Sequence, residues 1–225
     1  MFRSMNDLNG YMVEAIDGEV RSVDDILFDD ILWNVRYLVA NTGEWLPGRQ
    51  VLIAPEASQQ PDWRSRKIPV ALTKEQIENS PPLEMDKPVN KQWEQKFVPY
   101  YGWTTYWLDI DGDPHLRSMS EVKGYDIMAL DGEIGKVEDL IVDDEDWRIG
   151  YMVVDTSSWN PLSRKTMIPP EWITGIDEKE DTVLVDVKQS QVKDAPEYNA
   201  SEPINREVET VLYDYYGKPH YWANL

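Results

Sequence analysis

Short runs in which apolar residues alternate with polar or flexible ones dominate the chain. Tyr125, Ile127 and Ala129 alternate in this way, and the Asp-Gly pair that follows supplies the positive φ angles of a tight hairpin turn. Apolar residues return after the turn, but their spacing changes from two to three between Val137 and Leu140. That change indicates a β-bulge that bends the returning strand. The pattern predicts an antiparallel hairpin with one bent strand.

The same pattern occurs twice in the chain. Residues 10–47 match residues 124–161 at an offset of 114 (124 − 10), and residues 55–107 match residues 170–222 at an offset of 115 (170 − 55). Identical matched pairs include Gly10 and Gly124, Asp17 and Asp131, Trp33 and Trp147, Tyr37 and Tyr151, and Tyr106 and Tyr221. The offset changes only once, by one residue, over nearly the whole chain. This regular match indicates a duplication.

Further strands follow the hairpin in each copy. Residues 35–41 and their match 149–155 are apolar and β-branched, and a second hairpin is predicted where 172–176 and 182–187 flank an acidic turn. Each copy thus offers about five or six short strands at the spacing of a small barrel or sandwich. The bent strand favours closure into a barrel.

Helices are expected only late in each copy. Thr73 and Gln76 have the spacing of a capping box, and Asn90 and Asn205 are candidate N-caps for the segments that follow them. The helix after Asn205 is the better candidate, because the other contains Pro99.

The segment between the copies has no periodicity. Residues 108–120 carry Gly, Pro and Asp, which is typical of a linker. We therefore predict a mainly β protein of two tandem small antiparallel β-barrels, each followed by short C-terminal helical segments. The first barrel and its helical tail occupy residues 1–107, and the second occupies residues 121–225.

Composition narrows the range of partners and chemistry. The chain has 22 Lys and Arg against 42 Asp and Glu, a formal net charge of −20, which would repel nucleic acid phosphates. It contains no cysteine, so disulfides, thiolate metal sites and thiol catalysis are excluded. No apolar run approaches the roughly 18 residues of a membrane-spanning helix, and the N-terminus lacks a signal-peptide core. A cytoplasmic protein without a nucleic acid partner is expected.

Residues 109–113, DIDGD, begin like a calcium-binding loop with carboxylates at alternate positions. The rest of that pattern is missing, because Pro114 stands where glycine should follow and Ser120 stands where the last glutamate should be. An acidic linker is the favoured interpretation.

Other acidic and imidazole groups offer little for catalysis. Adjacent carboxylates in the Asp-Asp pairs at 29–30 and 143–144 point to different sides of the chain, so turn formation is favoured over acid-base chemistry. His115 and His220 are the two histidines, and nothing in the sequence brings them into one site. We expect no enzyme activity, no catalytic residue, no bound metal and no cofactor.

One loop in each copy is a candidate for partner contacts. Its residues are Trp45, Pro47 and Arg49 in the first copy and Trp159, Pro161 and Arg164 in the second. Tryptophan and arginine at a loop tip can anchor a protein partner. The alternative is that each tryptophan closes one end of its barrel.

The run RYLVANTGEWLPGRQVLIAPE, after a GYxVxAxDGExxxVxD opening, resembles the PRC-barrel domain. The tails at 88–107 and 203–222, with YYG and then YW, are similar to those of soluble bacterial proteins that carry the domain twice. The resemblance implies a small β-barrel in each copy. Members include the photosynthetic reaction centre H subunit, whose cytoplasmic domain caps a membrane complex, and a ribosome maturation factor that uses the barrel in protein contacts.

These uses imply a docking module. The sequence therefore predicts a non-enzymatic protein-interaction or scaffolding protein, and the resemblance alone suggests contact with a photosynthetic or other membrane complex. Self-association into a homo-oligomer is also open. The alternative function is binding of a small ligand or divalent cation, in a cleft between the barrels or at the acidic turns.

Overall fold

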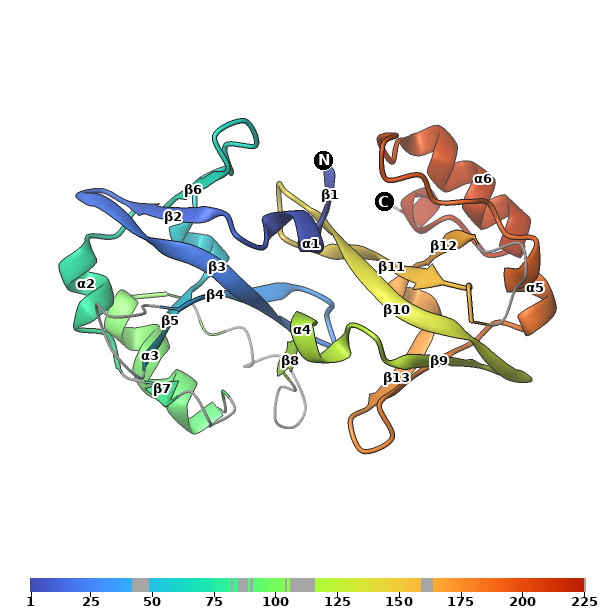
Figure 1. The fold of residues 1–225 in the computed structure, drawn as a ribbon, viewed down its shortest axis with the longest axis horizontal. Helices are drawn as coiled ribbons and strands as arrows, with labels where there is room; N and C mark the ends of the chain where they lie inside the picture. The colour runs from blue at the N-terminus through green and yellow to red at the C-terminus, as the bar shows by residue number, and fades with distance from the viewer. Residues whose placement is uncertain are drawn as a thin grey trace. The chain divides into compact units, whose positions relative to one another are not determined.

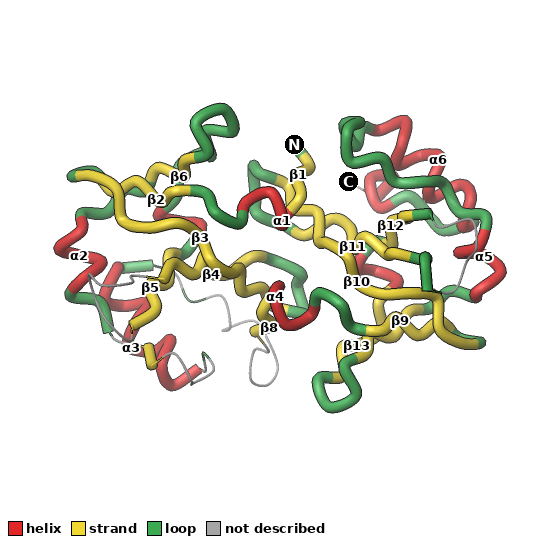
Figure 2. The backbone as a smooth tube through the Cα atoms, viewed as in Figure 1, coloured by secondary structure: helices red, strands yellow, loops and turns green. Residues whose placement is uncertain are grey.

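The fold is described from a computed structural model, and it comprises two compact units (Figure 1). The described residues are 1–41, 49–81, 83–84, 89, 91–103, 105, 116–158 and 164–224. Unit 1 contains residues 1–4, 121–143 and 148–225, and unit 2 contains residues 5–120 and 144–147. Strands dominate both units, as the tube drawing in Figure 2 shows.

Unit 2 is built on a sheet with the order β6-β2-β3-β4-β5-β7, and β8 pairs with β3. Its strands are β2 (Met12–Ala15), β3 (Gly18–Asp29), β4 (Val35–Asn41), β5 (Arg49–Ile53), β6 (Lys67–Pro69), β7 (Leu83–Glu84) and β8 (Leu116–Ser118). All neighbours are antiparallel except β2 and β6, which are parallel.

Helices cover part of the unit 2 sheet. They are α1 (Met5–Leu8), the 3-10 turn η1 (Pro55–Ala57), α2 (Lys74–Glu78) and α3 (Lys91–Tyr101). Phe97 of α3 is buried against Tyr37 and Leu52 of the sheet, so α3 buries one apolar stripe. It remains helical around Pro99, which lies in the last turn.

Unit 1 repeats this arrangement, with the order β12-β11-β10-β9-β14-β13 and with β1 paired to β10. Its strands are β1 (Phe2–Ser4), β9 (Asp126–Ala129), β10 (Gly132–Asp143), β11 (Ile149–Asp155), β12 (Lys165–Ile168), β13 (Ile173–Asp177) and β14 (Thr182–Val185). Its helices are α5 (Gln189–Lys193), α6 (Arg206–Tyr216) and the 3-10 turns η3 (Pro170–Trp172) and η4 (Tyr221–Asn224), while α4 (Met119–Val122) spans the division between the units.

The predicted hairpins and two of the three predicted helix caps are confirmed. Ala129 pairs with Gly132 across a two-residue turn, and the ladder shifts register between Val137 and Asp139, at the predicted bulge. One detail differs, because Gly132 has a positive φ angle whereas Asp131 does not. The Asn205 side chain caps α6 as predicted, and Thr73 with Gln76 forms the predicted capping box of α2. Asn90 lies outside the described residues.

The prediction of closed antiparallel barrels is wrong in two respects. Both sheets are mixed, because β14 runs parallel to β9 and β6 runs parallel to β2. Neither sheet closes into a barrel. In unit 1 the edge strands are β12 and β13, and β12 is followed at once by Pro169 and Pro170. These prolines lack the N–H groups that would extend pairing at this edge.

The sequence analysis missed the first strand of each copy. Strand β1 pairs with β10 in unit 1, and its match at an offset of 114, β8, pairs with β3 in unit 2. Each is held by the same bond: Ser4 Oγ donates to Asp139 Oδ2 and Ser118 Oγ donates to Asp25 Oδ2, both at 2.5 Å. The predicted linker at 108–120 thus contains strand β8 and the start of α4, and residues 106–115 lie outside the described part of the chain.

Candidate functional site

Only two of the six predicted partner-binding residues lie in the described part of the chain. Trp45, Pro47, Trp159 and Pro161 lie outside the described residues, and Arg49 begins β5. Arg164 is exposed, and its backbone is bonded to Thr156, whose Oγ1 accepts from Arg164 N at 3.2 Å and donates to Arg164 O at 2.6 Å. The role of the two Trp-Pro loops therefore stays a prediction.

The Asp-Asp pair of the first copy is engaged in turn formation, as expected. Asp29 is buried, and its Oδ1 accepts from the backbone N–H groups of Ile31 and Leu32 at 3.2 and 2.5 Å. Its Oδ2 accepts from Arg36 Nε at 2.7 Å. Asp30 forms an ion pair with Arg117 of β8 at 2.7 Å. These carboxylates stabilise the fold and do not converge on one reacting atom.

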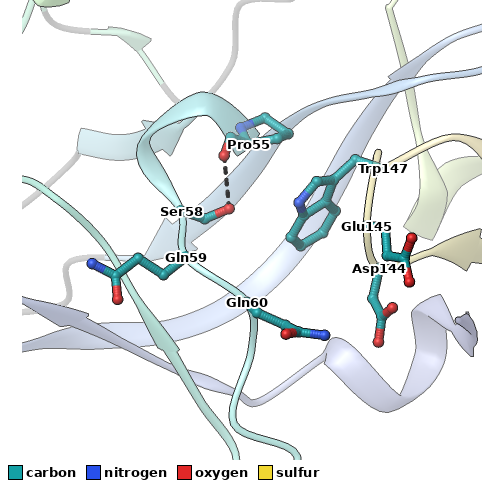
Figure 3. A pocket seen from close by; sticks show the side chains of 7 residues that line it. All are labelled: Pro55, Ser58, Gln59, Gln60, Asp144, Glu145 and Trp147. Atoms are coloured by element: carbon teal, nitrogen blue, oxygen red, sulfur yellow. Dashed lines mark hydrogen bonds between the residues drawn. The ribbon is translucent and has the colours of Figure 1, made fainter.

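The acidic turn of the second copy lines a pocket of about 400 Å³ in unit 2 (Figure 3). The lining residues are Pro55, Ser58, Gln59, Gln60, Asp144, Glu145 and Trp147. Figure 3 shows the indole of Trp147 and the two carboxylates on one side and Ser58 and Gln59 on the other. Ser58 Oγ donates to Pro55 O at 2.8 Å, which fixes that wall.

Backbone geometry holds Trp147 in this pocket. Its φ angle is +59°, a left-handed conformation that bulky residues rarely adopt. Trp33, its match in the first copy, has the same conformation at +56°, so both copies end the acidic turn in this way. Trp147 O accepts from Val35 N at 2.9 Å, which stabilises the turn.

The pocket chemistry suits a small cation. Two carboxylates offer charge, glutamine and serine side chains offer hydrogen bonds, and the indole face can attract an ammonium or guanidinium group. The described residues contain no group of three or more His, Cys, Asp or Glu side chains that could hold a metal ion.

A buried tyrosine–glutamate pair occurs in each copy, and the sequence analysis did not identify either pair. Tyr37 OH donates to Glu94 Oε1, and Tyr151 OH donates to Glu209 Oε1, both at 2.7 Å. The glutamates lie on α3 and α6, and both are buried. The signal was present in the sequence, because Glu94 and Glu209 match at the offset of 115 on otherwise apolar helix faces.

In unit 1 this pair belongs to a larger network. Tyr221 OH also donates to Glu209 Oε1 at 2.9 Å, and Arg206 approaches Glu209 Oε2 at 3.1 Å. The Arg206 guanidinium lies 4.2 Å from the centre of the Trp222 ring, which in turn stacks on His220. His220 Nε2 lies 2.9 Å from Asp214 Oδ1. The network ties the C-terminal residues to α6 and the sheet.

Burial and these contacts raise the pKa of several tyrosines. Burial is the main cause for Tyr151, and its bond to Glu209 adds to it, so the pKa of Tyr151 lies far above its ordinary 10.0. Burial likewise raises the pKa of Tyr213 and Tyr216. These phenols stay protonated at neutral pH, so Tyr151 keeps the proton that it donates to Glu209 Oε1.

The raised tyrosine pKa values predict loss of stability in alkali. Above about pH 10 an unfolded tyrosine loses its proton while the folded one keeps it, so stability falls as pH rises. Each such tyrosine contributes a slope of about 1.4 kcal/mol per pH unit. Absorbance at 295 nm should show a fraction of the tyrosines ionising only together with unfolding. Ionisation of all twelve tyrosines while circular dichroism stays native would contradict the assignment.

Comparison with known proteins agrees with one part of the chain. The model of the PRC-barrel domain matches residues 114–192, a range that contains β8 and extends into α5. No curated protein matches the chain. Among the described residues, no helix combines the length and the apolar character needed to cross a membrane. The chain is therefore a mainly β protein that contains a PRC-barrel domain at residues 114–192.

Proposed function

We propose that this protein is a cytoplasmic, non-enzymatic interaction or scaffolding module made of two PRC-type domains, and that its partner is another protein. The observation that carries the proposal is the exposure of two large apolar side chains at matching positions in both copies. Ile16 and its match Leu130 are 71% and 65% exposed, and Tyr100 and its match Tyr215 are 42% and 41% exposed.

Single exposed apolar side chains are common in folded proteins. Their occurrence at matching positions in the two copies is therefore what favours a partner. Elsewhere the copies differ at such positions: exposed Val211 matches Lys96, and exposed Ile31 matches Glu145. The hairpin-tip aliphatic residue and the helical tyrosine are kept in both copies although neither fills the core. A shared contact with a partner gives a reason to keep them.

The PRC-barrel match supports a docking role, by resemblance to the H subunit that caps a membrane complex. Contact with a photosynthetic or other membrane complex is part of the proposal on this ground alone. The Trp-Pro loops, with Trp45 and Trp159, are proposed as additional contacts. Their sequences differ between the copies, which suits loops that select the partner.

The test is affinity capture with the full chain and two double variants. One carries Ile16→Ser and Leu130→Ser, and the other carries Trp45→Ala and Trp159→Ala. We expect one protein that captures this chain reciprocally and loses about tenfold in affinity with at least one double variant. Equal recovery by wild type and both variants, or no reciprocal partner, would overturn the proposal.

A second candidate function is the binding of a small organic cation in the pocket of Figure 3. The proximity of Asp144, Glu145 and Trp147 favours it. Thermal melting with putrescine, tetramethylammonium, calcium or magnesium is the test, since a ligand at a hundred times its dissociation constant adds about 2.7 kcal/mol. Glu145→Gln is the matched variant and should weaken the shift. If none of the four compounds shifts the melting temperature, this candidate is removed.

A further inference from the structure

The exposed apolar residues of each copy belong to a surface built around a short helix. We call it the tip surface. In unit 2 it comprises the hairpin tip Ile16–Asp17, helix α2 and Tyr100, and in unit 1 it comprises Leu130–Asp131, helix α5 and Tyr215. Both lie at the β-hairpins that open the two copies (Figure 1).

Hydrogen bonds hold the unit 2 tip surface in shape. Ile16 N donates to Leu72 O at 2.9 Å, and Asp17 Oδ1 accepts from Lys74 N at 2.8 Å, so the hairpin tip is bonded to the start of α2. Tyr100 OH donates to Gln76 O at 2.9 Å. The hairpin tip is therefore hydrogen-bonded to Leu72 and to the first residue of α2, and Tyr100 is hydrogen-bonded to the third residue of α2.

Unit 1 repeats the two hydrogen bonds of the hairpin tip, whereas its tyrosine is held by a ring contact. Leu130 N donates to Val187 O at 2.9 Å, and Asp131 Oδ1 accepts from Gln189 N at 2.7 Å. Tyr215 packs edge-on against buried Tyr216, with ring centres 5.2 Å apart. The charge of Asp194, which follows α5, contributes to the raised pKa of Tyr215 after the larger effect of burial. The tip surface is thus preorganised in both units.

Acidic side chains surround the apolar residues. In unit 2 Asp17, Glu19 and Glu75 are exposed, and in unit 1 Asp131, Glu133 and Asp194 are exposed. The basic residues here are Lys74 on α2, Lys193 on α5 and Lys188 directly before α5, and Lys67 pairs with Glu19 at 3.2 Å, so the acidic residues exceed the basic ones by one in each unit. This excess of negative charge, in a chain of net charge −20, repels an anionic membrane, a nucleic acid and a second copy of the same surface.

We propose that each tip surface docks a basic, partly apolar segment of a partner protein, an inference that rests on the proposed function. Ile16 or Leu130, with Tyr100 or Tyr215, supplies the apolar contact, and the surrounding carboxylates attract Lys or Arg. Because the surface occurs twice, one chain binds two such segments. A partner that carries both segments on one molecule gains avidity when its linker spans the two surfaces.

The experiment is a methyl and amide NMR titration of the full chain with a synthetic peptide of alternating lysine and leucine. A peptide of the same length with glutamate in place of lysine is the matched probe. We expect the lysine peptide to shift the resonances of Ile16 and Leu130 and the amides of α2 and α5. The glutamate peptide should leave these resonances unchanged, and added salt should weaken the binding of the lysine peptide.

Variants assign the effect to the two surfaces. Ile16→Ser and Leu130→Ser should each abolish the shifts in their own unit and leave those in the other. Val211→Ser, at an exposed apolar residue without a match in the first copy, should change neither. Glu75→Lys and Glu133→Lys should each weaken the affinity of their own surface about tenfold.

Three outcomes would overturn the inference. The first is a lysine peptide that shifts only residues away from the tip surfaces, including the Trp-Pro loops, or shifts none. The second is equal binding of the glutamate peptide. The third is a concentration-dependent shift of Ile16 and Leu130 without peptide, which would identify a second copy as the occupant. The proposed function is judged separately by reciprocal capture, so it can stand when these fail.

Discussion

Gly135→Ala is expected to destabilise unit 1 by about 4 kcal/mol, through backbone strain and overpacking together. Gly135 is buried in β10 with a φ angle of +131°, and a Cβ atom there would lie 2.1 Å from Asp155 O in the neighbouring strand. A backbone oxygen in a ladder cannot move aside at low cost. Hydrogen exchange should show lost protection in β10 and β11 while unit 2 keeps its protection.

The first copy supplies the matched control. Position 21, which matches 135 at the offset of 114, is an exposed arginine in β3. Arg21→Ala should therefore shift the melting temperature little, as surface substitutions usually do. If the Gly135→Ala protein had the melting temperature of wild type and the same hydrogen exchange in β10, Gly135 could not lie as close to β11 as described.

Glu209→Ala is expected to destabilise unit 1 by about 3 kcal/mol. The substitution leaves the buried hydroxyl of Tyr151 and that of Tyr221 without their acceptor. Unpaired buried polar groups keep the full cost of desolvation. Chemical denaturation should show the loss, and hydrogen exchange should place it in α6 and β11. Because the chain has two units, each unit is followed separately.

Two further substitutions on α6 separate the loss of charge from the loss of hydrogen bonding. Glu209→Gln keeps an acceptor for the tyrosines and should cost only about 1 kcal/mol. Glu207→Ala, two residues earlier on α6 and exposed, removes an acidic residue from the first turn and should cost at most about 0.5 kcal/mol. Equal stability of the Glu209→Ala and Glu207→Ala proteins would contradict a stabilising role for the buried pair.

Local patterns predicted the parts of the fold that depend on neighbouring residues. The hairpin of β9 and β10, the bulge after Val137 and the strand 149–155 all follow from alternation, an Asp-Gly turn and a change of spacing. The caps at Thr73 and Asn205 follow from side chains that bond backbone groups two or three residues away. These interactions act within a few residues, so the sequence contains them directly.

The candidate site was less accessible to sequence reasoning. The Trp-Pro loops stand out because tryptophan, proline and arginine are distinctive, yet four of their six predicted residues lie outside the described structure. The tip surface carries no such motif. Ile16 comes directly after β2 (Met12–Ala15), and its 71% exposure separates it from the core residues Val13 and Ala15.

By itself the sequence determined the duplication, the antiparallel hairpins, the helix caps and the absence of cysteine chemistry. The tertiary structure alone decided that β14 runs parallel to β9, that β1 and β8 extend the two sheets, and that Glu94 and Glu209 are buried against tyrosines. Each of these depends on contacts between residues far apart in the chain. Their free energy comes from packing and desolvation, which no local pattern of apolar and polar residues records.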